Sequence, residues 1–242
     1  MHMFKAPSGA VFTSSDMDLI KALFHIGFVT WKEVPVVFKS KKTSNTYVRG
    51  RQDLTNNPHI LFEHLAPRIV DFVRKEIPIH DGRQHCLIGI PTAGTKLAMA
   101  AAACGYYRQV RPGIIYRELR VTKKTHGEDN TWAVGGPEHN NDVYISVEQA
   151  MTTATSILEH LSHLKEDGYA VHDMHHLILV DRELGGVENL VAHQFERVHV
   201  LFKLRDIIAA LVEMGLWPEE RYQTLLEEIK EDAHSRARIV AT

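Results

Sequence analysis

A segment near the middle of the chain combines residue types that could hold a phosphorylated sugar. The apolar run Val143–Val147 is followed by Glu148 and Gln149, and then by the hydroxyl-rich segment Thr152–Ser156. A carboxylate at the end of a strand can bind ribose hydroxyls or lie near a metal ion. Hydroxyl and backbone N–H groups at the start of a helix can hold a phosphate, because the helix dipole favours negative charge there. The alternative for Glu148 is a charge that only stabilises the helix start.

A second turn of this kind is Gly89–Thr95, which follows an apolar run and precedes an Ala-rich segment. Its backbone N–H groups could face an anion at the start of a helix. The turn is not a P-loop, because Lys96 comes after Thr95 and the Gly-Lys-Ser/Thr ending is missing. An ordinary connection between a strand and a helix remains the alternative interpretation.

Both turns need a scaffold, and the periodicity of the apolar residues predicts one. Short strands are expected at Pro35–Phe38, Thr46–Val48, Cys86–Ile90, Gly113–Tyr116, Val143–Val147, His176–Val180 and Val198–Phe202. Helices are expected at Asp16–Ile26, Pro58–Lys75, Leu97–Cys104, Thr155–Lys165, Leu204–Met214 and Pro218–Glu231. Strands that alternate with helices predict an α/β fold, with a twisted parallel sheet of about five strands flanked by helices. Ligands of such sheets bind at the carboxyl ends of the strands.

The segment with Glu148 resembles the signature of the type I phosphoribosyltransferases, an apolar strand followed by two acidic residues and Thr-Thr-Gly-Thr-Ser. Further motifs, in the same order along the chain, resemble those of the orotate phosphoribosyltransferases within that family. They are Phe38-Lys39-Ser40 with Ser44 and Tyr47, Arg120 with Lys124-Thr125-His126-Gly127-Glu128, Val180-Asp181-Arg182-Glu183-Leu184-Gly185-Gly186, and Val200–Ile208. The resemblance covers roughly residues 17–232.

The resemblance implies the type I phosphoribosyltransferase fold and transfer of phosphoribosyl from its diphosphate to orotate, which yields orotidine 5′-phosphate and pyrophosphate. It implies one domain over residues 1–242, with a small N-terminal hood at about 1–55, a core at about 56–210 and C-terminal helices at about 204–232. It also implies Mg²⁺ bound mainly through the diphosphate, with no metal ligand among the protein side chains. A homodimer in which a loop of one subunit reaches the other subunit's site is expected.

The resemblance also assigns roles to single residues. Lys124, His126 and Glu148 would be catalytic, the first two acting on pyrophosphate and the third on the ribose hydroxyls. Substrate binding would involve Lys39, Tyr47, Arg120, Lys123, Gln149, Thr152, Thr153, Ala154, Thr155, Ser156 and Arg182. Arg182 would bind the orotate carboxylate, which suits a bidentate guanidinium. From the residues alone, Lys39 could instead be a solvated turn lysine, and Arg182 could pair with Asp181 or Glu183.

Several positions depart from the family pattern. Gln149 replaces the second acidic residue, Ala154 replaces the signature glycine, and Val121 replaces a basic residue of the loop, for which Lys123 could substitute. A β-carbon at 154 could crowd a phosphate or oppose a positive φ. Two interpretations therefore stand, a divergent active enzyme and a relative that binds a nucleotide or a partner without turnover.

The composition agrees with a globular protein that binds small molecules. The chain has 242 residues, a formal net charge of −2 and two cysteines. The charge gives no argument for nucleic acid or membrane partners, and the two thiols indicate a reducing compartment, so we expect a cytoplasmic location. The sixteen histidines are interpreted as surface or hydrogen-bonded residues, and the tryptophans as packing residues rather than stacking platforms. Trp132 is the exception to watch, because it lies in the expected mobile loop. The polar stretch Arg120–Pro137 is expected to be a long mobile loop.

Overall fold

A five-stranded sheet lies at the centre of the part of the chain that the structure describes. The computed structural model describes residues 3–49, 53–79, 82–124, 130–137 and 142–240. The strands are ordered β6-β5-β7-β8-β9, and each neighbouring pair is parallel. They comprise β5 (Gln84–Gly89), β6 (Ile114–Glu118), β7 (Asp142–Met151), β8 (His175–Asp181) and β9 (Val198–Lys203). The predicted α/β fold with a parallel sheet of about five strands is confirmed.

The sheet is buried on both faces, and the alternation of its side chains explains how. Leu87 on β5 belongs to one hydrophobic cluster, while its neighbours Cys86 and Ile88 belong to the other. On β8, Leu177 and Ile178 divide between the two clusters in the same way. Successive side chains of a strand point to opposite faces, so near-continuous apolar strands are what a doubly covered parallel sheet requires.

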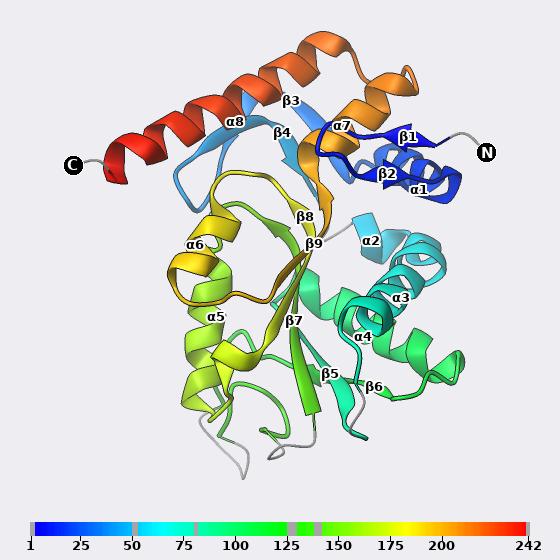
Figure 1. Cartoon of the computed structure of the whole chain (residues 1–242), viewed down its shortest axis with the longest axis vertical. Coiled ribbons are helices and arrows are strands. Elements are labelled where there is room, and N and C mark those ends of the chain that lie inside the picture. The colour runs from blue at the N-terminus through cyan, green and yellow to red at the C-terminus, as the bar shows by residue number, and fades with distance from the viewer. Residues whose placement is uncertain (1–2, 50–52, 80–81, 125–129, 138–141, 241–242) are drawn as a thin grey trace.

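Helices cover the two faces of the sheet. On one side lie α3 (Ala66–Glu76) and α4 (Ala93–Tyr107), and on the other lie α5 (Thr155–Glu166) and α6 (Gly186–Ala192) (Figure 1). Short elements complete the connections, namely α2 (Asp53–Asn56), a π-helical turn at Ile60–Leu65 and a 3₁₀ turn at Val171–Asp173. The carboxyl ends of the strands face the hood, so any ligand at that edge lies beneath it.

The hood is built from both ends of the chain. Its N-terminal part contains the pair β1 (Phe4–Lys5) and β2 (Val11–Phe12), α1 (Ser14–His25) and the antiparallel hairpin β3 (Val29–Val37) and β4 (Thr43–Val48). Its C-terminal part contains α7 (Leu204–Glu213) and the long helix α8 (Glu219–Val240), which lies across the hairpin (Figure 1). The tryptophans Trp31 and Trp217 meet edge to face between the two parts, with ring centroids 6.4 Å apart.

Some predicted boundaries are wrong, and the reasons are local. β7 continues through Glu148 and Gln149 to Met151, because these residues still pair with β8. The expected single helix from Pro58 is divided into a π-helical turn and α3. Helix α1 begins at Ser14, before the predicted Asp16, because Thr13 caps it in a capping box with Asp16. The short helix α6 and the pair β1–β2 have too few residues to show a periodicity.

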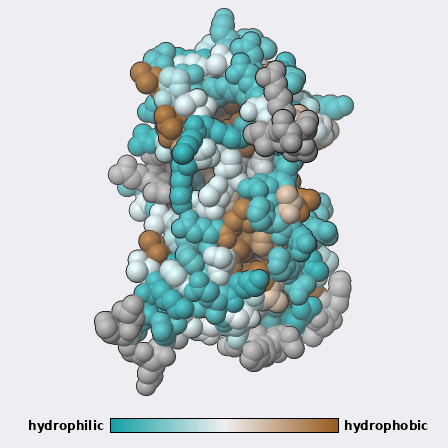
Figure 2. Space-filling view, turned by 90° about the vertical axis from the view of Figure 1, so that its left-hand side faces the viewer, coloured by the Kyte–Doolittle hydropathy of each residue, from teal (hydrophilic) through white to brown (hydrophobic). Residues whose placement is uncertain are grey.

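The surface is mainly polar on the side where α5 and α6 lie, with a small apolar area near its middle (Figure 2). Among the described helices, none combines the length and apolar character needed to cross a membrane. Cys86 is buried and Cys104 is partly buried, and both are free thiols. Several histidines pack against aromatic rings, for example His172 on Phe195 with parallel rings 4.9 Å apart, which agrees with their interpretation as packed or hydrogen-bonded residues.

Candidate functional site

The turn after β7 contains a positive φ at the position where the sequence motif has glycine. Ala154 lies in the left-handed region, with φ 61° and ψ 8°, and is followed at once by α5. This conformation costs a residue with a β-carbon roughly 1–2 kcal/mol, which explains why a glycine is the expected residue here. Asn189 Nδ2 donates to Thr153 O at 2.7 Å and holds the turn in place. The β-carbon of Ala154 therefore strains the turn but does not prevent its conformation.

The start of α5 has no side-chain cap hydrogen bond in the described part of the chain. The first N–H groups of a helix have no partner within the helix, so those of α5 are donors that a ligand could use. A small hollow of about 90 Å³ lies against them. It is lined by the segment Thr152–Ile157 on one side and by Phe38, Lys39 and Ser40 of the β3–β4 turn on the other. The predicted phosphate-binding residues 152–156 thus come together at one place and are covered by the hood.

A larger cleft of about 620 Å³ continues from this hollow between the hood and the sheet. It brings together residues from five separate segments of the chain. They are Phe38, Lys39, Tyr47, Val48, Arg49, Pro91, Thr92, Ala93, Glu148, Gln149, Ala150, Thr152, Ser156 and Arg182. Of the residues predicted from sequence, Lys39, Tyr47, Glu148, Gln149, Thr152, Ser156 and Arg182 therefore line one cleft.

Lys39 lines both hollows and is an exposed lysine with a partner. Its Nζ lies 2.7 Å from Glu159 Oε2 on α5. The Lys39 ammonium, hydrogen-bonded to Glu159, lowers the pKa of that carboxyl. Because the pair is well exposed, it contributes little to stability and can open at low cost. Lys39 thus lies beside the turn after β7, and its ammonium could leave Glu159 for an anion in the cleft at low cost.

Glu148 and Gln149 lie inside β7, so the alternative that Glu148 only stabilises a helix start is wrong. Glu148 Oε1 accepts the backbone N–H of Gln149 at 2.7 Å, and the side chain is partly buried in the cleft wall. Gln149 is buried, and its Nε2 has no hydrogen-bond partner among the described residues. A buried amide donor without an acceptor is costly, and a ligand oxygen in the cleft would satisfy it.

Arg182 is the most buried cation of the cleft, with 4% of its surface exposed. Nη2 donates to the backbone carbonyl of Thr46 on β4, and Nε has no partner among the described residues. The guanidinium carbon lies 4.0 Å from the centroid of the Phe38 ring, which in turn stacks on Tyr47. Burial lowers the pKa of Arg182 to about 10. A guanidinium held on an aromatic face with a free edge suits a bidentate acceptor such as a carboxylate.

The acidic neighbours of Arg182 do not pair with it. Glu183 forms an ion pair with Arg205 at 3.0 Å, and Asp181 Oδ1 accepts the backbone N–H of Glu183 at 3.0 Å. Burial raises the pKa of both carboxyl groups. The alternative interpretation of Arg182 as an ion-pair partner of Asp181 or Glu183 is therefore wrong.

The turn after β5 also reaches the cleft, through Pro91, Thr92 and Ala93. Gly94 explains why. A β-carbon on Gly94 would lie 2.0 Å from the carbonyl oxygen of Val147, so only glycine allows α4 to begin directly against β7. This contact places the turn beside Glu148, at the carboxyl edge of the sheet, where the N-terminus of α4 favours negative charge.

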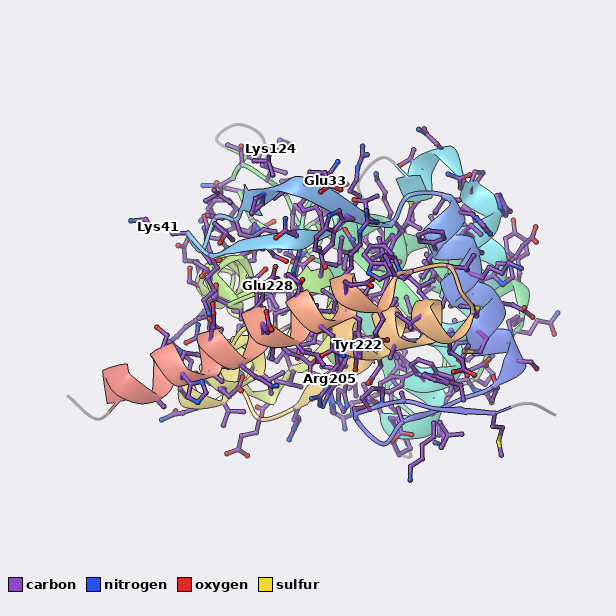
Figure 3. All side chains as sticks on the ribbon, turned by 90° about the horizontal axis from the view of Figure 1, so that it is seen from above. Glu33, Lys41, Lys124, Arg205, Tyr222 and Glu228 are labelled. Carbon is purple, nitrogen blue, oxygen red and sulfur yellow. The ribbon has the colours of Figure 1, made fainter. Side chains whose placement is uncertain are left out.

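Three of the residues predicted on the long loop are described, and these do not line the cleft: Arg120, Lys123 and Lys124. Lys124 is exposed at the outer edge of the molecule (Figure 3), and Lys123 Nζ lies 3.5 Å from Glu166 on α5. Arg120 Nη1 donates to the carbonyl of Thr131 within the same loop. His126 lies outside the described residues. In the described chain, Arg120 and Lys123 do not line the cleft that contains Arg182, and their role in substrate binding stays a prediction.

The reason lies in how the base of this loop is held. Trp132 stacks on His163 of α5 with ring centroids 3.6 Å apart and planes 3° apart, and its Nε1 donates to Glu166 at 2.8 Å. Leu119 and Ala133 form a β-bridge, and Ala133 N donates to Asp167 at 2.7 Å. These contacts direct the segment toward α5 and away from β8. Trp132, the exception among the tryptophans in the sequence, packs on α5 in the structure.

Some residues of the cleft were not predicted as functional from the sequence. Phe38 forms the aromatic face under Arg182, and Thr46 provides the carbonyl that orients it. The sequence around Phe38 gives no signal for this role, because a ring that stacks on a cation and a ring that packs in a core look alike in sequence. Among the described residues, no group of three or more His, Cys, Asp or Glu side chains could hold a metal ion.

Comparison with known proteins supports the fold. No protein-family model matches the sequence. The structure is similar to the UMP synthase of Leishmania donovani, with a TM-score of 0.69 and 17% identity, over 90% of this chain and 43% of that chain. It is also similar to the orotate phosphoribosyltransferase of Mycobacterium tuberculosis, with a TM-score of 0.55 and 18% identity for the complex with Fe(III) dicitrate, over 80% of this chain and 98% of that chain. The complex of the same enzyme with inorganic phosphate gives a TM-score of 0.54 and 16% identity, over 81% of this chain and 99% of that chain.

The chain therefore spans less than half of the UMP synthase chain and nearly the whole length of the tuberculosis enzyme. At these identities the likeness concerns the fold. The chain has the type I phosphoribosyltransferase fold, as the sequence motifs predicted.

Proposed function

We propose that this protein transfers phosphoribosyl from phosphoribosyl diphosphate to a pyrimidine that carries a carboxylate, with orotate as the substrate. The observation that carries the proposal is the position of Arg182. Its guanidinium is buried on the Phe38 ring, has a free Nε, and lines the same cleft as the β7 turn. A carboxylate on the base would pair with this cation, whereas uracil and the purines offer no such group.

The remaining cleft residues suit the sugar and its phosphates. The turn Thr152–Ser156 would bind the 5′-phosphate, Glu148 and Gln149 the ribose hydroxyls, and Pro91–Ala93 the pyrophosphate, with Lys39 shared between anions. In the reaction, the bond from C1 of the ribose to the pyrophosphate oxygen breaks and a bond from C1 to the ring nitrogen forms. Negative charge accumulates on the leaving pyrophosphate, so cations near it stabilise the transition state.

Magnesium fits this cleft as an ion bound mainly to the substrate. Glu148 is the carboxylate that lines the cleft, and one protein carboxylate together with substrate oxygens is a usual magnesium environment. When bound, the ion would neutralise charge on the pyrophosphate. We also propose a homodimer in which the Arg120–Pro137 loop reaches the partner's cleft, because in one chain Lys124 lies away from the pyrophosphate turn.

The loss of orotate absorbance in the presence of phosphoribosyl diphosphate and Mg²⁺ tests the proposal. We expect a rate that stops when Mg²⁺ is chelated, and pyrophosphate release in equal amount. Arg182→Lys keeps a positive charge but loses the planar fork, so we expect a KM for orotate raised about tenfold to a hundredfold, with the KM for the diphosphate little changed. If neither orotate nor any other base is consumed, the proposed reaction is wrong.

A second function, ligand binding without turnover, is favoured by two residues of the β7 turn. Ala154 holds a strained positive φ, and Gln149 brings no charge to the ribose hydroxyls. Under this hypothesis the diphosphate raises Tm but no base is consumed. Gln149→Asp combined with Ala154→Gly would then create or raise activity. If these changes lower an activity that is already present, the hypothesis of a degenerate site is wrong.

A further inference from the structure

Helix α8 contacts both segments that form the proposed base site. It lies across the β3–β4 hairpin, which carries Phe38, Tyr47 and the Thr46 carbonyl, and it reaches the loop after β8, which carries Arg182 (Figure 1). Viewed from above, Glu228 lies on the part of α8 that crosses the hairpin (Figure 3). The proposed roles of the cleft residues use none of the side chains of α8.

Glu228 binds the strand segment that orients Arg182. Its Oε2 accepts a hydrogen bond from Ser44 Oγ at 2.6 Å, and its Oε1 accepts one from the backbone N–H of Asn45 at 3.0 Å. Ser44 Oγ in turn accepts the backbone N–H of Thr46 at 3.0 Å, and the Thr46 carbonyl accepts from Arg182 Nη2. One carboxylate of α8 is therefore connected by a short series of hydrogen bonds to the guanidinium in the cleft.

A second group of contacts holds the loop after β8 against the same helix. Lys42 Nζ forms an ion pair with Asp232 and donates to the carbonyl of Leu184 at 2.8 Å. Arg236 binds Asp232 at 2.8 Å and Glu188 at 3.1 Å. Its side chain lies over Gly185, where a β-carbon would come within 2.8 Å of Arg236 Cδ. Lys42 and Arg236, both bound to Asp232, thus join the hairpin and α8 to the segment that follows β8.

The charge of Glu228 also acts on Arg182. Burial lowers the pKa of Arg182, and the negative charge of Glu228 opposes that effect. Asp181 and Glu183, the acidic neighbours in sequence, are occupied by other partners. Glu228 is therefore the carboxylate that supports the buried guanidinium without occupying its free edge.

We infer that Glu228 is a positioning residue for base recognition, which acts through Ser44 and Thr46 to hold the Arg182 guanidinium toward the carboxylate of the incoming base. The inference rests on the proposed transfer to a carboxylate-bearing base. It makes α8, at the C-terminal end of the chain, a part of the specificity apparatus as well as a cover for the hairpin. A role in base recognition predicts a change in the KM for the base and little change in the KM for the diphosphate. The hydrogen bonds of Glu228 in the described chain go to Ser44 and Asn45, whereas Asn189 holds the β7 turn.

The test compares Glu228→Ala with two matched variants. Glu228→Gln keeps an acceptor for the Asn45 N–H but removes the charge. Glu227→Ala removes a carboxylate from the adjacent, exposed position of the same helix. For each protein, the KM for orotate, the KM for the diphosphate, kcat and Tm are measured. We expect Glu228→Ala to raise the KM for orotate about tenfold and the KM for the diphosphate less than about twofold. Glu228→Gln should give a KM for orotate between those of wild type and Glu228→Ala. Glu227→Ala should behave like wild type. Equal increases in both KM values would overturn the inference.

A ligand-free measurement separates this inference from the proposed function. The Nε–H signal of Arg182, identified by its loss in Arg182→Lys, should exchange slowly with water because the group is buried. Glu228→Ala should accelerate that exchange about tenfold, and Glu227→Ala should not. Unchanged exchange in Glu228→Ala overturns the positioning role, whatever the enzyme does. Faster exchange in a protein that consumes no orotate supports the positioning of Arg182 by α8 and shows that the proposed reaction, rather than the positioning, is wrong.

Discussion

The turn after β7 and the segment after β6 leave the same edge of the sheet, but different contacts hold them. The β7 turn is fixed by parallel pairing with β8 up to Met151 and by the bond from Asn189 to Thr153. The segment after β6 is fixed by one β-bridge at its base and by the stack of Trp132 on His163. The first arrangement follows from the sheet itself, whereas the second depends on a few side chains of α5.

The proposed binding residues lie at strand ends, whereas the proposed catalytic cations lie on the segment after β6. Residues on strand ends are placed within the cleft by the register of the sheet, and Glu148, Gln149 and Arg182 are all of this kind. Lys124 lies beyond the β-bridge, in no helix or strand, so the register of the sheet does not determine its position. We therefore expect the cleft residues at strand ends to hold their positions before a ligand binds. The position of Lys124 on the loop is expected to adjust when a ligand binds.

The largest effect is expected from Lys124→Ala. If the loop brings Lys124 to the pyrophosphate in the transition state, its removal should lower kcat by about 100- to 1,000-fold, while Tm and the affinity for the diphosphate change little. Initial rates and thermal unfolding measure these quantities. Lys41→Ala is the control, because Lys41 is an exposed lysine of the β3–β4 turn. A Lys124→Ala enzyme with normal turnover would show that the loop has no catalytic cation at this position.

The proposed action of Lys124 across a dimer has its own test. A heterodimer of a Lys124→Ala chain and an Arg182→Ala chain, purified through two different tags, contains one site with both residues intact if the loop serves the partner. We expect activity well above that of either homodimer. An inactive heterodimer, or the failure of such a heterodimer to form, would contradict loop exchange.

Acid should loosen the sheet that carries the β7 turn. His176 on β8 is fully buried and hydrogen-bonded to Ser146 of β7 at 2.8 Å, and burial lowers its pKa from 6.5 to about 4. Below pH 6.5 the unfolded chain binds a proton that the folded chain resists, so the free energy of unfolding falls as pH drops toward 4. We expect this residue to contribute about 2–3 kcal/mol to the loss. His176→Asn should flatten the slope of stability against pH, and the exposed His193→Asn should not. If His176→Asn leaves the slope of stability against pH unchanged, His176 is not the residue whose protonation destabilises the folded chain.

Trp132 offers a way to release the loop segment without touching the sheet. Trp132→Ala removes both the stack on His163 and the bond to Glu166, and Trp132→Phe keeps only a stack. We expect backbone amide exchange at Arg120 and Val134 to rise about tenfold in Trp132→Ala and less in Trp132→Phe. Exchange at β7 and β8 should stay constant. Equal acceleration in the strands would show that the two regions are not independent.

The smallest expected effect concerns the strain in the β7 turn. Ala154→Gly removes the cost of a positive φ, so we expect the free energy of unfolding to rise by about 0.5–1 kcal/mol. Ala150→Gly, in β7 itself, should lower it by a similar amount because glycine weakens a strand. Denaturant unfolding of both variants measures the difference. A loss of stability in Ala154→Gly would mean that the left-handed conformation is not strained.

The features that could be predicted from the sequence are those encoded by neighbouring residues or by a regular alternation of strands and helices. The five strands and the fold could be predicted because apolar runs of strand length alternate with helical patterns. The end of β7 could not, because Glu148 and Gln149 are polar residues in a strand and their pairing with β8 is a tertiary contact. The residues that meet in the cleft could be predicted when they follow strands, since the sheet determines where strand ends lie.

The rest of the site depends on contacts between distant segments. The docking of Trp132 on α5 and the support of Arg182 by Thr46 and Glu228 join residues that are far apart in the sequence. No spacing along the chain encodes such contacts. The same holds for α8, whose amphipathic pattern predicts a helix but not the hairpin on which it lies.

A crystal structure with phosphoribosyl diphosphate bound tests the account most directly. We predict the 5′-phosphate in the hollow between Thr152–Ser156 and Lys39, the ribose hydroxyls at Glu148, and the pyrophosphate at Pro91–Ala93, with the edge of Arg182 left free for a base. A diphosphate bound elsewhere, or a 5′-phosphate excluded from the turn by the β-carbon of Ala154, would contradict the assignment of this cleft to phosphoribosyl transfer.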